Sequence, residues 1–376
     1  MPKREISKDN PILVVKPYVN EKAIQNVIEV LRSGWIGEGP KVREFENKLS
    51  EKFKINYLAA LHSGTAALHL ALHVGGIKPG DEVITTAQTC TATNHAILME
   101  RAKPVFADIR YEDVNIDPDS ISRKITPRTK AIICVHWAGY PCNLDEINKI
   151  ARENNLFVIE DAAHALGATY KGESIGNISD FTTFSFQAIK QLTTADGGML
   201  ASKHPPHIEK VKLKRWFSIP RNNKEETICC EPLYDIKEVG FKYQMNDVAA
   251  AIGLGNLEDF DHFKKHRSEI VKLYREELEN IPGITLLENN QDRTSGNWLF
   301  SMHVKNREKF AAKLKQNHIN TSVVHLRNDK FTAFGPLRND LPQTEKAYHT
   351  LISLPLHNHL TEHEVQHVIS IIKQGW

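Results

Sequence analysis

Two residues in the middle of this 376-residue chain, Lys190 and Asp161, are of the types that hold and activate an aldehyde cofactor. A lysine amine forms a Schiff base with the aldehyde of pyridoxal phosphate (PLP), and an aspartate keeps the pyridine nitrogen protonated so that the ring withdraws electrons. A lone lysine is most often a surface residue. The pair suggests a PLP site with Lys190 as its catalytic residue, and an ordinary surface lysine remains the alternative until further motifs are considered.

The segments around this pair have the alternating pattern of an α/β fold, with short β-rich runs separated by helical patterns. Candidate helices cover residues 63–73 and 143–154, and Asn143 is a candidate cap of the second. The candidate strands are 82–86, 104–107, 131–136, 156–160, 182–186 and 198–202. This alternation predicts a largely parallel sheet covered by helices.

Asp161 and Lys190 are expected at one edge of this sheet. Asp161 follows an apolar strand run, and Lys190 follows the next strand after a short loop. Ligand sites in such sheets lie beyond the carboxyl ends of the strands. The two side chains should therefore reach the same crevice.

A second, smaller domain is expected at the C-terminal end. From about Leu257 the pattern changes to a long amphipathic helix, followed by alternating short strands and helices such as 306–316 and 361–373. We therefore expect a large domain over residues 1–255 and a smaller α+β domain over residues 256–376.

The composition is that of a globular protein, and its charge balance predicts no particular partner. Hydrophobic residues make up 41% and charged residues 25%, and the formal net charge is +2. Nucleic-acid binding normally needs a clustered basic surface, and the basic residues here are mixed with acidic ones. We therefore expect no nucleic-acid partner.

The five cysteines, including the adjacent Cys229 and Cys230, lack the paired spacing of a structural zinc site, so we expect reduced thiols and no metal site. Residues 1–10 are charged, without an apolar signal core, and no stretch approaches the ~20 apolar residues of a membrane span. We therefore expect a cytoplasmic protein that does not bind a membrane.

The segment His62-Ser63-Gly64-Thr65-Ala66 is a candidate phosphate-binding turn, because it ends an apolar run and opens a helix. A helix start offers unpaired N–H groups and a positive dipole, and glycine lets an anion approach closely. Ser185 could serve the same phosphate. The alternative is that Ser63 and Thr65 only cap the helix and that Ser185 is a solvated strand-end hydroxyl.

Several motifs occur in order along almost the whole chain. They are Ser33-Gly34-Trp35-Ile36, Gly39-Pro40, Phe45-Glu46, Gly80-Asp81-Glu82-Val83-Ile84, Glu160-Asp161-Ala162-Ala163-His164, Ser185-Phe186 with Lys190, Leu192-Thr193-Thr194, Gly197-Gly198 and Leu354-Pro355-Leu356-His357. Together they resemble the DegT/DnrJ/EryC1/StrS family of PLP-dependent sugar aminotransferases. The resemblance implies the type I fold of PLP-dependent transferases, which is similar to that of aspartate aminotransferase.

The resemblance also implies roles for individual residues. Asp161 matches the aspartate on the pyridine nitrogen, and His164 matches the contact to the cofactor's 3-hydroxyl, often a glutamine in the family. A histidine can donate this hydrogen bond but can also titrate, which would make the site sensitive to pH. The residues matched to the cofactor phosphate are Gly64, Thr65 and Ser185.

Two positions depart from the family pattern. Cys90 stands where many members stack an aromatic ring on the cofactor, and it offers only a polarisable sulfur. Lys242 stands where the family has an asparagine that reaches the cofactor phosphate of the neighbouring subunit, and a cation would also bind that anion. The resemblance thus implies a homodimer with shared active sites, although Lys242 could instead be a solvated lysine.

The activity implied is a transamination with PLP as cofactor, L-glutamate as amino donor and a nucleotide-linked keto sugar, such as a 4-keto-6-deoxy sugar, as acceptor. Lys190 would move the proton as general base and acid. The resemblance and the mix of aromatic and polar groups place candidate sugar contacts in four loops. These contacts are Trp35, Ile36, Glu38, His136, Trp137, Arg215 and His325.

Three other functions are considered. A sugar dehydratase of the same family would carry a histidine in place of Lys190. A non-catalytic PLP-binding regulator would usually need an attached DNA-binding module, for which the short N-terminus leaves no room. A nicotinamide-dependent oxidoreductase would need a glycine-rich fingerprint after the first strand, and the chain lacks it.

Overall fold

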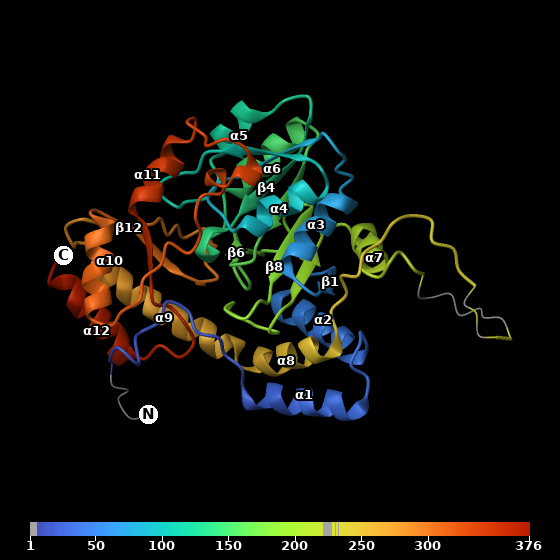
Figure 1. The fold of residues 1–376 in the computed structure, drawn as a ribbon, viewed down its shortest axis with the longest axis horizontal. Helices are drawn as coiled ribbons and strands as arrows, with labels where there is room; N and C mark the ends of the chain where they lie inside the picture. The colour runs from blue at the N-terminus through green and yellow to red at the C-terminus, as the bar shows by residue number, and fades with distance from the viewer. Residues whose placement is uncertain (1–5, 221–227, 230, 232) are drawn as a thin grey trace.

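The larger part of the protein is built around one seven-stranded sheet (Figure 1). The structure is a computed structural model that describes residues 6–220, 228–229, 231 and 233–376. The strands of this sheet are β1 (Leu58–Leu61), β2 (Glu82–Thr86), β3 (Lys103–Ala107), β4 (Thr129–Val135), β5 (Phe157–Asp161), β8 (Phe181–Ser185) and β9 (Gly198–Ala201). The helices are α1 (Glu21–Ser33), α2 (Pro40–Phe53), α3 (Gly64–Val74), α4 (Thr91–Met99), α5 (Pro118–Lys124), η1 (Trp137–Gly139), α6 (Leu144–Glu153), α7 (Pro205–Lys214) and α8 (Asp247–Glu258).

The strand order β1-β9-β8-β5-β4-β2-β3 confirms the predicted α/β sheet. Strands β3, β2, β4, β5 and β8 are parallel, and β9 is antiparallel to both β8 and β1. Every predicted strand is present, with ends displaced by one or two residues at most. Asp161 pairs in register with Val135 on β4 and Thr183 on β8, so the carboxyl ends of these strands are level.

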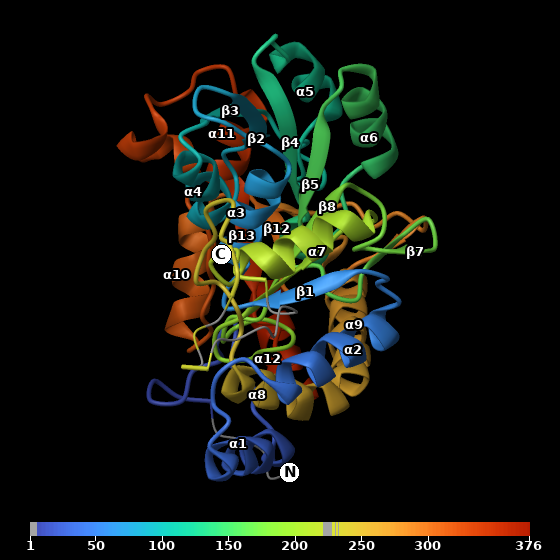
Figure 2. The same ribbon diagram turned by 90° about the vertical axis from the view of Figure 1, so that its right-hand side faces the viewer.

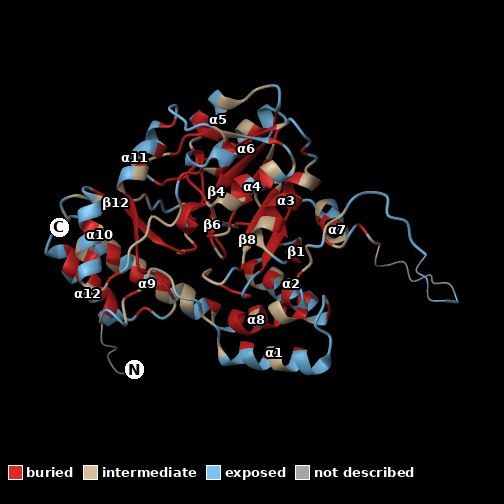
Figure 3. Cartoon of the chain, in the orientation of Figure 1, coloured by how far each residue is buried: buried red, intermediate tan, exposed pale blue. Residues whose placement is uncertain are grey.

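Helices cover both faces of the sheet, which is why its strands are apolar almost throughout. Side chains of α3, α4 and α7 form the core on one face, and those of α2, α5, α6 and α8 form it on the other. Figure 2 shows α5 and α6 beside β4 and β5, and α1 below α8. In Figure 3, buried residues concentrate in the strands, and exposed residues lie on the outer sides of α1 and α10 (Arg307–Gln316).

The smaller part has its own core around a three-stranded antiparallel sheet, β10 (Ile284–Leu286), β12 (Phe300–Val304) and β13 (Leu351–Leu354). Its other helices are α9 (Phe260–Leu278), η2 (Asn328–Lys330), η3 (Thr332–Phe334), α11 (Pro342–Thr350) and α12 (Glu362–Lys373). A third small sheet joins β6 (Thr169–Tyr170), β7 (Glu173–Ser174) and β11 (Arg293–Thr294). Thr361 and Glu364 form a capping box that fixes the start of α12.

The N-terminal segment belongs structurally to this smaller part. Ile12 is buried in its core and forms a parallel bridge with Ile319. The predicted boundary between residues 255 and 256 falls inside α8, which packs against α1 and α2, whereas α9 packs against α12. These contacts place α8 with the larger part and α9 with the smaller part, and the division of the chain into two domains at residue 255 stays a prediction.

Two further details concern sequence predictions. Asn143 precedes α6 but makes no side-chain capping bond, because its amide oxygen accepts a hydrogen bond from Arg293 instead. Cys90, Cys134, Cys142 and Cys229 are free thiols, and Cys230 lies outside the described residues. No helix within the described ranges is long and apolar enough to cross a membrane.

Candidate active site

A cavity of about 400 Å³, called here the Lys190 hollow, opens beyond the carboxyl ends of β4, β5 and β8. Side chains from both parts of the chain line it, because the loop before β12 and the loop at Val324 close over the sheet edge. The predicted site residues that the structure brings together here are Gly64, Thr65, Cys90, Asp161, His164, Ser185, Lys190 and His325. These side chains surround one ligand-sized space.

Asp161, the last residue of β5, is buried in the wall of this hollow. The hydroxyl of Thr93 donates to Oδ2 at 2.7 Å, and the N–H of Ala163 donates to Oδ1 at 3.2 Å. Burial raises the pKa of Asp161, while these hydrogen bonds and the charge of Lys190 oppose the rise. A buried carboxylate is costly without a positive partner, and the protonated ring nitrogen of PLP would supply that positive charge.

Lys190 follows β8 and lies against an aromatic face from the smaller part. Its Nζ is 3.6 Å from the ring centroid of Trp298. Burial lowers the pKa of Lys190 to about 8, even though Asp161 and Cys90 favour the charged form. Because a free lysine has a pKa near 10.4, Lys190 is neutral and nucleophilic at a much lower pH.

His164 is held as a neutral imidazole. Burial and the charges of Lys190 and His325 lower its pKa well below the usual value. Its ring stacks on Trp298 with centroids 3.8 Å apart. Of the two properties that the sequence left open for this histidine, the structure therefore favours an uncharged hydrogen-bonding group over a group that titrates near neutral pH.

Three buried ring nitrogens have no hydrogen-bond partner within the described part of the chain: His164 Nδ1, Trp137 Nε1 and His325 Nε2. His164 and His325 line the hollow, whereas Trp137 lies outside its lining and contacts both histidine rings edge-on. An unsatisfied buried polar group costs about 1–3 kcal/mol. Val324, which precedes His325, has a φ of 64°, and the N–H of His325 donates to the carbonyl of Val323 at 2.7 Å. A β-branched residue in this conformation is strained, which is typical of functional sites.

The start of α3 forms the opposite end of the hollow. Ser63 caps this helix by accepting from the N–H of Ala66, so the helix dipole and the remaining first-turn N–H groups face the space beside Ser185. A Cβ on Gly64 would lie 3.0 Å from the Cβ of Ser185, so glycine leaves the turn open. This end has the form of an anion-binding cup.

Other sequence candidates lie outside the lining of the hollow. His136 is fully buried, with its ring nitrogens 2.9 Å from Glu160 and 3.1 Å from the N–H of Cys142. Arg215 forms ion pairs with Glu38 at 2.7 Å and Glu46 at 2.6 Å. These contacts connect distant segments of the larger part, so they position the fold around the site.

The remaining candidates lie near the surface. Trp35 and Ile36 are 58% and 55% exposed. The Nζ of Lys242 lies 3.8 Å above the ring of Trp216, outside its own chain's hollow. Their contacts with a substrate or with a second subunit stay predictions.

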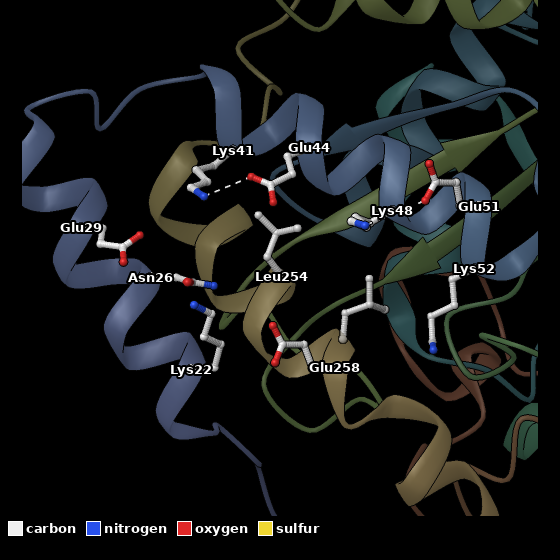
Figure 4. Close-up of a pocket in the computed structure, with 11 residues that line it drawn as sticks. Lys22, Asn26, Glu29, Lys41, Glu44, Lys48, Glu51, Lys52, Leu254 and Glu258 are labelled. Carbon is white, nitrogen blue, oxygen red and sulfur yellow. Dashed lines mark hydrogen bonds and ion pairs between the residues drawn. The ribbon is translucent and has the colours of Figure 1, made fainter.

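A second cavity, of about 550 Å³, lies between α1, α2 and α8 (Figure 4). Its lining includes positively charged lysines and negatively charged glutamates, and Lys41 and Glu44 form an ion pair of 3.0 Å. Partly exposed pairs of this kind are ordinary surface features. None of the predicted site residues borders it. Across the described ranges, no group of three or more histidine, cysteine or acidic side chains could hold a metal ion.

The chain matches the model of the DegT/DnrJ/EryC1/StrS aminotransferase family over residues 17–373. The chain belongs to this family. It is 34% identical over 376 residues to the UDP-4-amino-4-deoxy-L-arabinose--oxoglutarate aminotransferase of Shewanella sediminis, with 96% of each chain covered. Among solved structures it is similar to AtS13 from Actinomadura melliaura, with 36% identity, a TM-score of 0.93 and coverage of 97% and 99% of the two chains.

Membership confirms that the protein is a PLP-dependent sugar aminotransferase of fold type I. A further structural relative is Spr1654 of Streptococcus pneumoniae in its PLP form, with 31% identity, a TM-score of 0.89 and coverage of 97% and 98% of the two chains. The side chains of the Lys190 hollow fit this cofactor, with a reactive amine, a buried carboxylate, orphaned ring nitrogens and an anion cup.

Two residues of the site, Thr93 and Trp298, are not among those predicted from the sequence. Thr93 fixes the carboxylate of Asp161, and its position inside the segment that contains Cys90 was an available signal. Trp298 has no comparable signal in the sequence. It reaches the site through a long-range contact, in which its indole N–H donates to the carbonyl of Ile189 at 2.9 Å across a separation of 109 residues.

Proposed function

We propose that this aminotransferase transfers an amino group from L-glutamate to a nucleotide-linked keto-deoxy sugar, with a 4-keto-6-deoxy sugar as the first candidate. The observation that carries the proposal is that Lys190 and Asp161 face one hollow with an anion cup at its far end. The name of the Shewanella relative includes a UDP-linked amino sugar and oxoglutarate, which supports the same classes of acceptor and donor.

The chain's own residues have separate tasks in this proposal. When bound, PLP supplies a ring that withdraws electrons from the carbon losing its proton. Lys190 holds the cofactor between turnovers, and its amine takes and returns a proton in each half-reaction. Asp161 keeps a positive charge on the ring nitrogen, and neutral His164 donates a hydrogen bond to the ring oxygen.

The sugar would enter from the side of His325 and Trp137. His325 lines the hollow and Trp137 packs against it, and the ring nitrogens His325 Nε2 and Trp137 Nε1 have no hydrogen-bond partner among the described residues. Burial lowers the pKa of His325 to about 4. A neutral ring in this position donates to or accepts from a sugar hydroxyl without adding charge.

We further propose a homodimer in which Lys242 reaches the phosphate cup of the second copy. Asp196 also lines the hollow and would repel a phosphate. A cation from outside the chain would offset this repulsion, and Lys242 does not line its own hollow. In this proposal, Lys242 replaces the family's asparagine with a cation that attracts the phosphate electrostatically.

The direct test replaces Lys190 by alanine and uses the exposed Lys309→Ala as a matched control. Purified K190A should lose the covalent cofactor that borohydride fixes on the wild-type chain, and turnover with L-glutamate and nucleotide-linked keto sugars should fall at least 1000-fold. K309A should keep both properties. Fixation of the cofactor on K190A with normal turnover would overturn the assignment.

A further inference from the structure

Arg267 on α9 is a buried cation with no acidic partner among the described residues. It is 2% exposed, and its Nη1 donates to the side-chain oxygen of Asn358. Its Nε and Nη2 have no hydrogen-bond partner within the residues that the structure describes. By contrast, buried Arg215 and Arg327 each have two acidic partners.

The guanidinium lines a narrow cavity, called here the Arg267 hollow, on the side of Lys190 away from the larger cavity. Lys190, Ile189 and Trp298 line both cavities, so these residues form the wall between them. The other polar residues that line the Arg267 hollow are Lys16, Gln191, His357 and Asn358. Two basic side chains therefore stand behind the reactive lysine.

A carboxylate is the ligand that this arrangement suits. Burying an uncompensated charge costs several kcal/mol, and burial lowers the pKa of Arg267 to about 10, with no acidic group opposing the change. The guanidinium is still charged at neutral pH. Its unused Nε and Nη2 belong to the planar fork that binds a carboxylate through two parallel hydrogen bonds.

We propose that Arg267 binds the distal carboxylate of a dicarboxylic amino donor and so selects donors of the glutamate class. The donor's amine must take the place of the Lys190 amine, so the rest of the donor must extend from that point. The Arg267 hollow has a volume of only about 10 Å³ while the Lys190 side chain forms its wall. The proposal therefore requires Lys190 to move aside once the donor's amine has replaced it, and the space that it leaves would take the end of a chain but not a sugar.

This inference rests on the proposed function, so the first test uses the cofactor-free protein. At equal ionic strength, glutarate should raise the melting temperature of the wild type by several degrees, whereas glutaramide, the uncharged diamide of the same length, should not. The shift should vanish in Arg267→Met and shrink in Arg267→Lys, which keeps the charge but loses the fork. An equal shift in wild type and R267M would overturn the site.

The second test follows the visible absorbance of the bound cofactor during the donor half-reaction. In R267M the rate with L-glutamate should fall 10- to 100-fold, while the slow rate with L-alanine should stay within about twofold, consistent with the loss of one charged hydrogen-bonding group. Equal losses with both donors would show a structural role and overturn the inference. If R267M does not fold, R267K is judged by the same ratio of donors.

The two proposals fail in different ways. If wild type reacts with no amino donor at all, the proposed function is wrong. If wild type reacts with L-glutamate and R267M keeps the wild-type preference for L-glutamate over L-alanine, only the role of Arg267 is wrong.

Discussion

The surroundings of one amine set the reactivity of the site. Burial holds the pKa of Lys190 near 8, although Asp161 and Cys90 favour its charged form. The indole of Trp298 lies over the ammonium and also stabilises the charged form. Desolvation therefore outweighs the attraction of these groups for the ammonium, and the amine loses its proton close to physiological pH.

The pH dependence of cofactor attachment follows from this value. Because only the neutral amine reacts, the rate at which cofactor-free protein combines with PLP should rise as the pH increases through about 8 and level off above about 9. Stopped-flow absorbance measures this rate. A rate that keeps rising to pH 10 would show an ordinary lysine and contradict the role of burial.

His164 should not contribute a second titration. Its pKa is held well below its ordinary value, so the imidazole stays uncharged from pH 6.5 upward. Replacement by glutamine, which keeps a neutral hydrogen-bonding group, should leave the shape of the activity profile between pH 6.5 and 7.5 unchanged. Loss of an inflection near pH 6.5 in H164Q would show that His164 does titrate.

Two glycines at the start of α3 and on β9 shape the cup by different contacts. A Cβ on Gly64 would touch the side chain of Ser185 at 3.0 Å, whereas a Cβ on Gly198 would lie 2.3 Å from the backbone of Ser63. The first contact can relax by movement of a side chain, and the second requires movement of the strand or the turn.

Alanine at these two glycines should therefore have separable effects. Gly64→Ala should weaken PLP binding several-fold, with little change in the melting temperature. Gly198→Ala should reduce the free energy of unfolding by about 1–3 kcal/mol, because it overpacks the core. Equilibrium dialysis and denaturant titration measure the two quantities. Equal destabilisation by both substitutions would contradict this distinction.

The part of the site predictable from sequence is the part encoded locally. Asp161 and Lys190 each follow a strand whose apolar run is visible, so their place at the sheet edge could be predicted. Trp298 and Arg267 reach the same region from segments more than 75 residues away from Lys190 along the chain. No local pattern reports such contacts, because they depend on how the smaller part folds over the sheet.

The same limit explains Arg215. From the sequence it was a candidate sugar contact, because it lies in a loop beside an aromatic residue. In the structure it pairs with Glu38 across a separation of 177 residues and with Glu46 across 169. Its role as a sugar contact stays a prediction, because a single sequence does not show whether an arginine forms buried ion pairs, binds a ligand or does both.

For the whole molecule, sharing of the site between subunits can be tested with mixed dimers. Lys190→Ala should be essentially inactive alone, and Lys242→Ala should be weakly active because its cup loses a charged contact worth about 1.5–3 kcal/mol. When refolded together, they should form mixed dimers in which one site has both lysines. Activity should then rise toward half of the wild-type value per mixed dimer. No rise would show that Lys242 acts within its own chain or not at all.

The bridge between Ile12 and Ile319 has a consequence for the order in which the protein is assembled. Backbone hydrogen bonds of 2.9 Å join Ile12 to His318 and Asn320 on either side of this bridge. During synthesis the first segment must wait until nearly the whole polypeptide has left the ribosome, whereas all strands of the large sheet are available after Ala201. The sheet can therefore form before its first residues find their partners, and the last core to close is the one that holds both ends of the chain.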